Sequence, residues 1–325
     1  MKHMKKISVS VTVYNEEDNL RELHRRLTEV FTQKLANYEY EIIFIDNHSS
    51  DDSRAVLEEI AAGDRRAKAI LNAGNYGQGR SNFHGIVTAY GDCVVSMAGD
   101  LQDPPEVIPE MVAEWEKGHR VVAGVKTTSK ENKLMYAVRH VYYAFMKKFS
   151  DIHHIPHFTL FGLYDAAFVK MLRGLNDPNP YLKGLVAEFG GDVALVEYEQ
   201  DKRKAGKSSY NFLRLYDIAM LSITSCTRSV VRFATIFSFL GALLSFLFGL
   251  ALLIYKLLRP EAFLGTASVI VVVSFIGALQ LSFIGLIAEY IMNINSKQIN
   301  KPLVMEERRI NFDADSERTE ENVTG

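Results

Sequence analysis

The chain has 325 residues, an apolar content of 48% and a formal net charge of −2. This length allows more than one average domain with a buried core. The small net charge predicts no general affinity for nucleic acid, so any recognition of an anion has to be local. Cys93 and Cys226 lack C-x-x-C spacing, which predicts reduced structural thiols and no zinc site.

Residues 1–215 alternate short apolar runs with amphipathic stretches. Strands are predicted at residues 7–14, 41–46, 67–72, 92–97 and 121–124. Helices are predicted between them, at residues 15–32, 53–62, 80–89 and from the Pro-Pro pair to about 117. This alternation predicts an α/β fold, a Rossmann-like, mostly parallel sheet with helices on both faces. The N-terminal MKHMKKISVSV runs directly into the first strand without a signal-peptide pattern, so this part is expected in the cytoplasm.

Polar clusters follow three of the predicted strands. They are Tyr14-Asn15-Glu16, Asp46-Asn47 and Asp100-Leu101-Gln102. In open α/β sheets, ligands bind beyond the carboxyl ends of the strands, so these clusters predict a nucleotide site. Asp100 and Gln102 offer the oxygen ligands that a hard cation such as Mg²⁺ or Mn²⁺ takes on a diphosphate.

Two apolar segments without charged residues, 233–255 and 262–288, each exceed the length of about 20 residues that crosses a bilayer. We expect transmembrane helices at about 233–258 and 262–290, and the flanking basic residues modestly favour both termini in the cytoplasm. The expected organisation is a catalytic domain at 1–208, amphipathic juxtamembrane helices at 209–232, the hairpin at 233–294 and a largely disordered tail at 295–325. A helical hairpin buried in a soluble core is the alternative.

The motifs Tyr14-Asn15-Glu16-Glu17, Asp46-x-x-Ser49-x-Asp51 and Asp100-Leu101-Gln102-Asp103-Pro104-Pro105 resemble those of family 2 glycosyltransferases with the GT-A fold. The D-L-Q-D-P-P string with two C-terminal spans is similar to the polyisoprenyl-phosphate glycosyltransferases, relatives of the dolichol-phosphate mannose synthases. The resemblance covers residues 5–300. It implies inverting transfer of a hexose or N-acetylhexosamine from a UDP- or GDP-sugar, with Mg²⁺ or Mn²⁺, to a lipid phosphate such as undecaprenyl phosphate. It further implies a multi-pass protein of the inner (plasma) membrane that forms homo-oligomers and serves cell-envelope glycan modification.

The same resemblance implies roles for individual residues. Nucleotide-sugar binding falls to Tyr14, Glu16, Asp46, Asn47, Asn75 and Asp100, and metal binding to Asp100 and Gln102. The basic segment before the membrane resembles the family's R-x-x-G-x-S/T motif and would bind the acceptor phosphate through Arg203, Lys204, Lys207 and Ser208. Asp100 and Arg203 are the expected catalytic residues. A phosphate monoester is already anionic at neutral pH, so the reaction needs no general base.

The chain departs from the family pattern at several positions. Asn47 replaces the second acid of the usual pair, and Ala98 replaces the first acid of D-x-D. Glycine occupies two positions that are often basic, Gly74 and Gly162. These departures support an alternative, a catalytically silent membrane-bound scaffold, which Asp100, Gln102 and the basic segment oppose. A processive polysaccharide synthase is the other alternative, but the only tryptophan, Trp115, lies outside any Q-x-x-R-W motif.

Overall fold

The structure is a computed structural model that describes residues 4–127, 155–175, 177–200 and 301–312, with separate helical residues between 236 and 294. Contacts divide the chain into two compact units. The first unit comprises Met1–Arg139, His154–Asn211 and Ile299–Gly325, and the second comprises His140–His153 and Phe212–Gln298.

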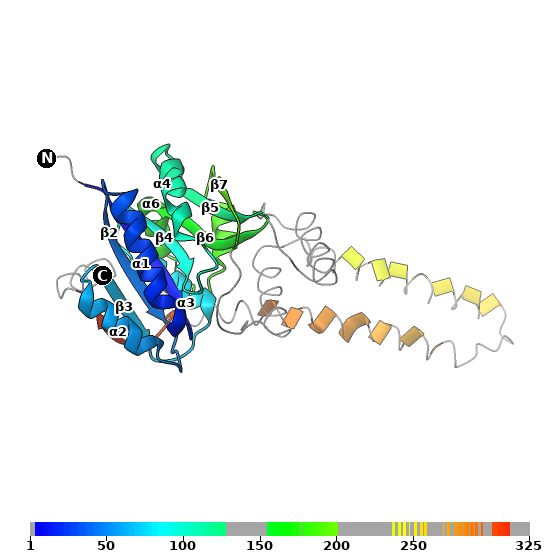
Figure 1. Ribbon diagram of the computed structural model, residues 1–325. Helices are drawn as coiled ribbons and strands as arrows, with labels where there is room; N and C mark the ends of the chain where they lie inside the picture. The colour runs from blue at the N-terminus through cyan, green and yellow to red at the C-terminus, as the bar shows by residue number, and fades with distance from the viewer. Residues whose placement is uncertain are drawn as a thin grey trace. The chain divides into compact units, whose positions relative to one another are not determined.

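The described residues of the first unit contain one sheet of eight strands in the order β7-β5-β6-β4-β1-β2-β3-β8 (Figure 1). The strands are β1 (Lys6–Val13), β2 (Glu39–Asp46), β3 (Ala67–Asn72), β4 (Cys93–Ala98), β5 (Val121–Lys126), β6 (Phe158–Asp165), β7 (Ala194–Tyr198) and β8 (Glu306–Ile310). The helices are α1 (Glu17–Gln33), α2 (Ser53–Gly63), α3 (Gln78–Thr88), the 3-10 turn η1 (Pro105–Val107), α4 (Ile108–Glu116), α6 (Ala166–Arg173) and α7 (Leu182–Phe189).

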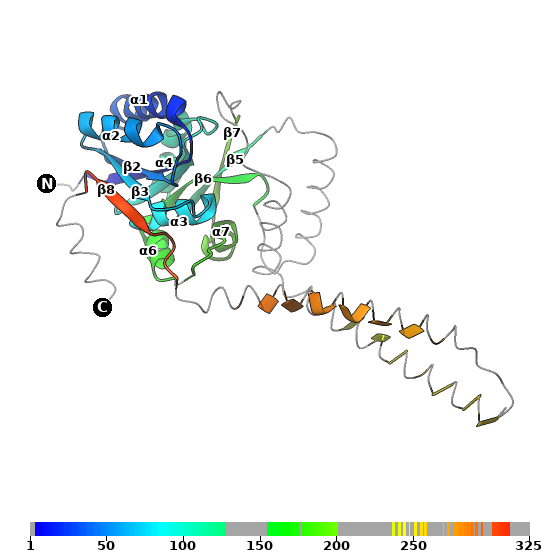
Figure 2. The same ribbon diagram turned by 90° about the horizontal axis from the view of Figure 1, so that it is seen from below.

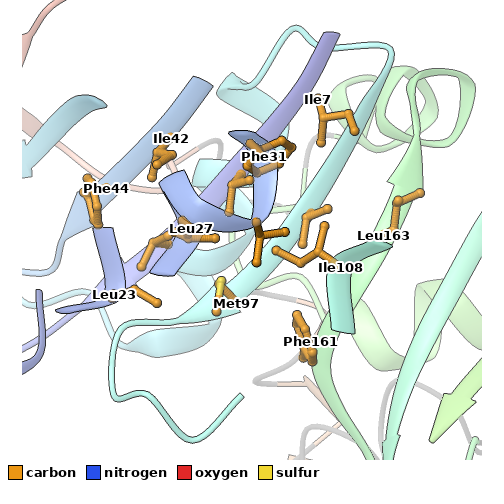
Figure 3. Close-up of a cluster of buried hydrophobic side chains, with 14 of the residues drawn as sticks. Ile7, Leu23, Leu27, Phe31, Ile42, Phe44, Met97, Ile108, Phe161 and Leu163 are labelled. Carbon is orange, nitrogen blue, oxygen red and sulfur yellow. The ribbon is translucent and has the colours of Figure 1, made fainter. Parts of the chain in front are cut away.

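Helices cover both faces of the sheet, as Figures 1 and 2 show. Apolar side chains of α1, α2 and α4 form one buried cluster with the strands, and those of α3, α6 and α7 form a second. Figure 3 shows part of the first cluster, where Leu23, Leu27 and Phe31 of α1 pack above the sheet. These residues recur at helical spacing, so α1 buries one continuous apolar face. The prediction of a sheet covered on both faces is confirmed.

Strand β6 makes the sheet mixed. It lies antiparallel between β4 and β5, whereas β3, β2, β1 and β4 are parallel neighbours. No strand was predicted in the segment FTLFGLYD that forms β6. The sheet is therefore parallel at its centre and mixed towards both edges.

The C-terminal tail is ordered over residues 301–312, so the predicted disorder of residues 295–325 is wrong for this stretch. Strand β8 pairs antiparallel with β3 and forms the edge of the sheet (Figure 2). The Glu306 carboxylate lies 2.7 Å from His84 Nε2, and the Asn311 amide donates to the backbone oxygens of Ala61 and Ala67 at 2.7 and 2.8 Å. Arg308 also pairs with Glu58. The charge of this stretch was misread as a sign of disorder, because Glu306 and Arg308 find partners on the rest of the folded domain.

Glu306 makes the attachment of β8 dependent on pH. Burial alone would raise the pKa of Glu306, but hydrogen bonds from His84 and Arg309 outweigh it and lower the pKa to about 2. A lowered pKa in the folded state gives stability that is present above the unfolded pKa near 4.5 and is lost as the pH falls towards 2.

We therefore expect the wild type to lose up to about 3 kcal/mol more of its unfolding free energy than Glu306→Gln between pH 5 and pH 2. Thermal unfolding of both proteins at several pH values measures this difference. Parallel pH profiles for the two proteins would show that Glu306 is not held in this way.

The second unit contains the two predicted transmembrane segments, and most of their residues lie outside those that the structure describes. The described ones between 236 and 294 are helical, and several expose apolar side chains, including Leu244 (67%), Leu258 (76%) and Leu281 (70%). Within the described part of the chain, no helix is both long and apolar enough to cross a membrane. The juxtamembrane segment 209–232 lies wholly outside the described residues.

Candidate active site

The three polar clusters lie side by side because β2, β1 and β4 are parallel neighbours. In the sheet register Val13 is opposite Asp46, and Thr12 is opposite Ala98. All three strands therefore end at the same edge, and the loops that follow them meet there. Each loop contains one non-glycine residue with a positive φ: Asn15 at 56°, His48 at 63° and Leu101 at 57°. Such conformations are uncommon for side chains other than asparagine and cluster at functional sites.

The loops after β1 and β2 are joined by hydrogen bonds. Asn15 donates its backbone N–H to Ser49 Oγ at 3.0 Å, and its side-chain oxygen accepts from Ser50 N at 2.8 Å. The Glu16 backbone N–H donates to Ser53 Oγ at 2.9 Å. The Glu16 side chain is only 6% exposed and accepts from the Asn19 amide, whereas Tyr14 is 38% exposed. In this arrangement Glu16 holds the loop in place, and Tyr14 is the most accessible residue of this cluster.

Asp46 is completely buried at the end of β2. Its oxygens accept from the backbone N–H of Ser49 at 3.2 and 3.3 Å, and Oδ2 accepts from Arg54 Nε at 2.7 Å. A buried carboxylate needs such partners because desolvation of an unpaired charge is costly. Asp46 therefore acts on the site through the loop that it holds. Arg54, on the first turn of α2, is a site residue that the sequence motifs did not reveal.

Asn47 and Asn75, both predicted for the nucleotide, are in direct contact. The Asn47 amide donates to Asn75 Oδ1 at 2.9 Å, and Asn47 Oδ1 accepts from Tyr76 N at 2.9 Å and Ser81 Oγ at 2.8 Å. An aspartate has no N–H to donate, so the departure from the family's acid pair has a structural reason. Asn47 links the loop after β2 to the loop and helix that follow β3.

Asn47→Asp is expected to lower the free energy of unfolding by about 1–3 kcal/mol, because it removes a buried donor and places a carboxylate against Asn75 Oδ1. Asn47 is 5% exposed, so water cannot compensate for the loss. Denaturant unfolding measures the change, with Asp52→Asn, an exposed charge change in the same loop, as the control. Equal stability of the two variants would contradict the role of the Asn47–Asn75 pair.

The loop after β4 presents Asp100 and Gln102 with partly exposed side chains. The Gln102 backbone N–H donates to Asp100 Oδ1 at 3.2 Å. Between them Leu101 is 2% exposed and packs into the core, which anchors the turn. Carboxylate and amide oxygens at the carboxyl edge fit the preferences of a hard divalent cation. The described residues contain no group of three or more His, Cys, Asp or Glu residues arranged to hold a metal.

Asp103 forms a buried contact that the sequence motifs did not predict. It is 5% exposed, and its Oδ1 accepts from Tyr198 of β7 at 2.5 Å. The Tyr198 hydroxyl also lies 2.8 Å from Thr159 Oγ1 of β6. Burial raises the pKa of Asp103 to about 6, although its bond to Tyr198 opposes this. The D-L-Q-D-P-P loop is therefore fixed to β6 and β7 through its second aspartate.

The presence of glycine at position 162 of β6 also has a structural reason. A Cβ at this position would lie 2.8 Å from the backbone oxygen of Val122 on the neighbouring strand. A basic side chain here would force the two strands apart, which explains why this position is a glycine. The predicted acceptor residues Arg203, Lys204, Lys207 and Ser208 lie outside the described residues.

Comparison with known proteins identifies the family of this chain. Residues 8–169 match the sequence profile described as "Glycosyl transferase family 2". The uncharacterized glycosyltransferase YkcC of Bacillus subtilis is 33% identical over 301 residues, which is 91% of this chain and 91% of that protein. The bactoprenol glucosyl transferase of Shigella phage SfV is 31% identical over 307 residues, 94% of this chain and 99% of that protein.

Among solved structures, glucosyl-3-phosphoglycerate synthase from Mycobacterium tuberculosis, in complex with Mn²⁺, UDP and phosphoglyceric acid, has a TM-score of 0.48. It is 16% identical and the match covers 68% of this chain and 76% of that one. The sheet described above is parallel at its centre and has helices on both faces, as the sequence predicted. The family profile and the relatives matched along nearly their whole length show that this chain is a glycosyltransferase and belongs to glycosyl transferase family 2.

Proposed function

We propose that this enzyme transfers a hexose or N-acetylhexosamine from a nucleotide-sugar, expected to be a UDP-sugar, to a polyisoprenyl phosphate such as undecaprenyl phosphate. One observation carries the acceptor assignment: several relatives matched over 88% or more of this chain are bactoprenol glucosyl transferases or their homologues. Bactoprenol is a polyprenol, and its phosphate is the form that can attack a sugar. The lipid-linked sugar would serve modification of cell-envelope glycans.

The donor nucleotide would lie across the edge where β1, β2 and β4 end. The accessible Tyr14 is suited to contact the base, and Asn47 and Asn75 shape the wall between β2 and α3. Asp100 and Gln102 lie at the other side of this edge and would hold Mg²⁺ or Mn²⁺ against the diphosphate. A bound cation neutralises charge on the leaving diphosphate.

The acceptor phosphate needs alignment more than activation. Its second pKa is near 6, so it is an anionic nucleophile at neutral pH. The chain therefore has to hold the phosphate in line with the anomeric carbon, on the face opposite the leaving diphosphate, which gives inversion. Arg203, Lys204, Lys207 and Ser208 are the proposed contacts, because a guanidinium binds two phosphate oxygens at once.

We further propose that residues 233–258 and 262–290 are two membrane spans with the active site on the cytoplasmic face. Residues on both sides of this segment belong to one sheet, because β8 pairs with β3. A chain that leaves the sheet and returns to it has to cross a membrane an even number of times. The exposed apolar side chains of the described helical residues are consistent with a lipid environment. A homo-oligomer is the proposed assembly.

The deciding experiment is transfer from a panel of UDP- and GDP-sugars to undecaprenyl phosphate by the full-length protein in detergent. Formation of a lipid-linked sugar with one donor, dependent on Mg²⁺ or Mn²⁺, is the expected result. Nucleotide binding without turnover on any donor would favour the silent scaffold. A product with many sugars on one acceptor would favour the processive synthase.

A further inference from the structure

Arg54 connects the loop after β2 to the C-terminal strand. Its Nε donates to Asp46 Oδ2 at 2.7 Å, and its Nη1 donates to Glu307 Oε2 of β8 at 2.9 Å. Its Nη2 donates to the Asn72 backbone oxygen at the end of β3 at 2.6 Å. One guanidinium therefore binds the ends of β2 and β3 and a strand that is about 250 residues further along the chain.

Arg54 helps to fix the loop after β2, which contains Asn47. Asp46 is completely buried and has two hydrogen-bond donors, Arg54 and the Ser49 backbone. The next residue, Asn47, forms the link to Asn75. A shift of Arg54 would move the Asp46 carboxylate and, with it, the contact between Asn47 and Asn75 at the proposed donor site.

A β-bulge in β8 is consistent with the direction of Glu307. Leu71 is opposite Arg308, but the next residue of β3, Asn72, is opposite Glu306. Glu307 is thus an extra residue without a partner in the register. Bulges bend a strand locally and redirect a side chain, and they are frequent next to active sites. Here the redirected side chain meets Arg54.

We propose that Glu307 and Arg54 are positioning residues for the nucleoside diphosphate part of the donor, and that β8 is thereby a component of the donor site. This inference rests on the proposed function. Arg54 is 24% exposed and Glu307 is 53% exposed, so the pair is accessible to solvent and contributes little to folding. The purpose of the contact is to fix the guanidinium that holds Asp46.

The attachment of β8 itself depends on other contacts. His84 binds Glu306, Glu58 pairs with Arg308, and the Asn311 amide binds backbone oxygens. The Arg308–Glu58 pair is a matched control for Arg54–Glu307. It also joins α2 to β8, it is also exposed, and no hydrogen bond or ion pair recorded among the described residues connects it to Asp46 or Arg54.

The test compares Glu307→Gln with Glu58→Gln in the full-length protein in detergent. UDP and GDP are the probes, binding is measured by calorimetry, and steady-state kinetics gives KM for the donor, KM for the lipid and kcat. We expect Glu307→Gln to raise Kd and donor KM about threefold or more and Glu58→Gln to leave them unchanged, with equal Tm values. Lipid KM and kcat should not move in either variant. Arg54→Lys, which keeps the charge but loses the fork, should raise donor KM about tenfold.

Equal donor affinities of Glu307→Gln, Glu58→Gln and the wild type would overturn the inference and leave the proposed function in place. Equal losses in both variants, accompanied by a lower Tm, would mean that β8 acts only on stability and would overturn it too. If the folded wild type binds neither UDP nor GDP, the proposed function itself fails. The two failures are therefore distinguishable in one set of measurements.

Discussion

Asp100→Asn is expected to reduce turnover by about 10²–10³ while the protein stays folded, because it removes the charge that would hold the cation and keeps the shape of the side chain. Asp100 is partly exposed at the end of β4, and the Gln102 backbone N–H donates to its Oδ1 within the same turn. An asparagine can accept that hydrogen bond equally well. We therefore expect kcat to fall and the concentration of Mg²⁺ or Mn²⁺ that gives half-maximal rate to rise. The Tm should not change.

Asp92→Asn is the matched control for Asp100→Asn. Asp92 directly precedes β4, so it lies at the opposite end of the same strand, and its exposed carboxylate accepts from Lys6 N at 2.7 Å. Both substitutions remove one negative charge, but only one does so at the carboxyl edge of the sheet. Near-normal turnover of Asp100→Asn with unchanged metal dependence would refute the assignment of Asp100.

Arg203→Lys is expected to lower kcat/KM for the lipid phosphate at least about tenfold, on the order of 1.4 kcal/mol of transition-state stabilisation. A lysine keeps the charge but binds phosphate through one point instead of a planar fork. The result bears directly on the acceptor contact, because the close approach of the Val122 backbone oxygen excludes a basic side chain at position 162. Saturation kinetics with undecaprenyl phosphate in detergent measures the effect.

Lys207→Ala and salt dependence separate a phosphate contact from a membrane-surface patch. A surface patch weakens steeply with ionic strength, whereas a partly buried phosphate contact is screened much less. We expect Lys207→Ala to reduce kcat/KM for the lipid phosphate less than Arg203→Lys does. The reduction in Arg203→Lys should persist at high salt. Small, equal and salt-sensitive losses in both variants would assign the segment to the membrane surface, and another cation would then have to hold the acceptor.

Local sequence patterns predicted the parallel centre of the sheet well. The strand predicted at 67–72 matches β3, and the helix predicted at 53–62 differs from α2 by one residue. These elements are specified by neighbouring residues, through apolar runs and turn chemistry. Strands β6, β7 and β8 were missed because their pairing depends on partners far along the chain. β6 has glycine at a steric contact, and β8 is mostly charged, so neither resembles an isolated strand.

The sequence placed the polar clusters at the ends of the strands, and these ends share one edge of the sheet, but the contacts within the clusters were not predicted. The polar residues that follow the predicted strands include Tyr14, Asp46 and Asp100, and the three strands do end at the same edge of the sheet. The burial of Asp46 and Glu16 was not visible in the motifs, because burial depends on which side chains fill the space around a loop. Arg54 and Tyr198 belong to no motif, and only the folded chain shows that they hold Asp46 and Asp103.

The pairing of β8 with β3 has a consequence for biosynthesis. A ribosome completes β3 long before it reaches residue 306, and the two long apolar segments emerge in between. Until then the backbone N–H and C=O groups along the outer edge of β3 have no strand to pair with, and open edges of this kind invite aggregation. Nascent chains stalled before β8 should therefore depend on chaperones more than completed ones. The sheet edge closes only after both apolar segments have been made, so its closure is a late event of synthesis.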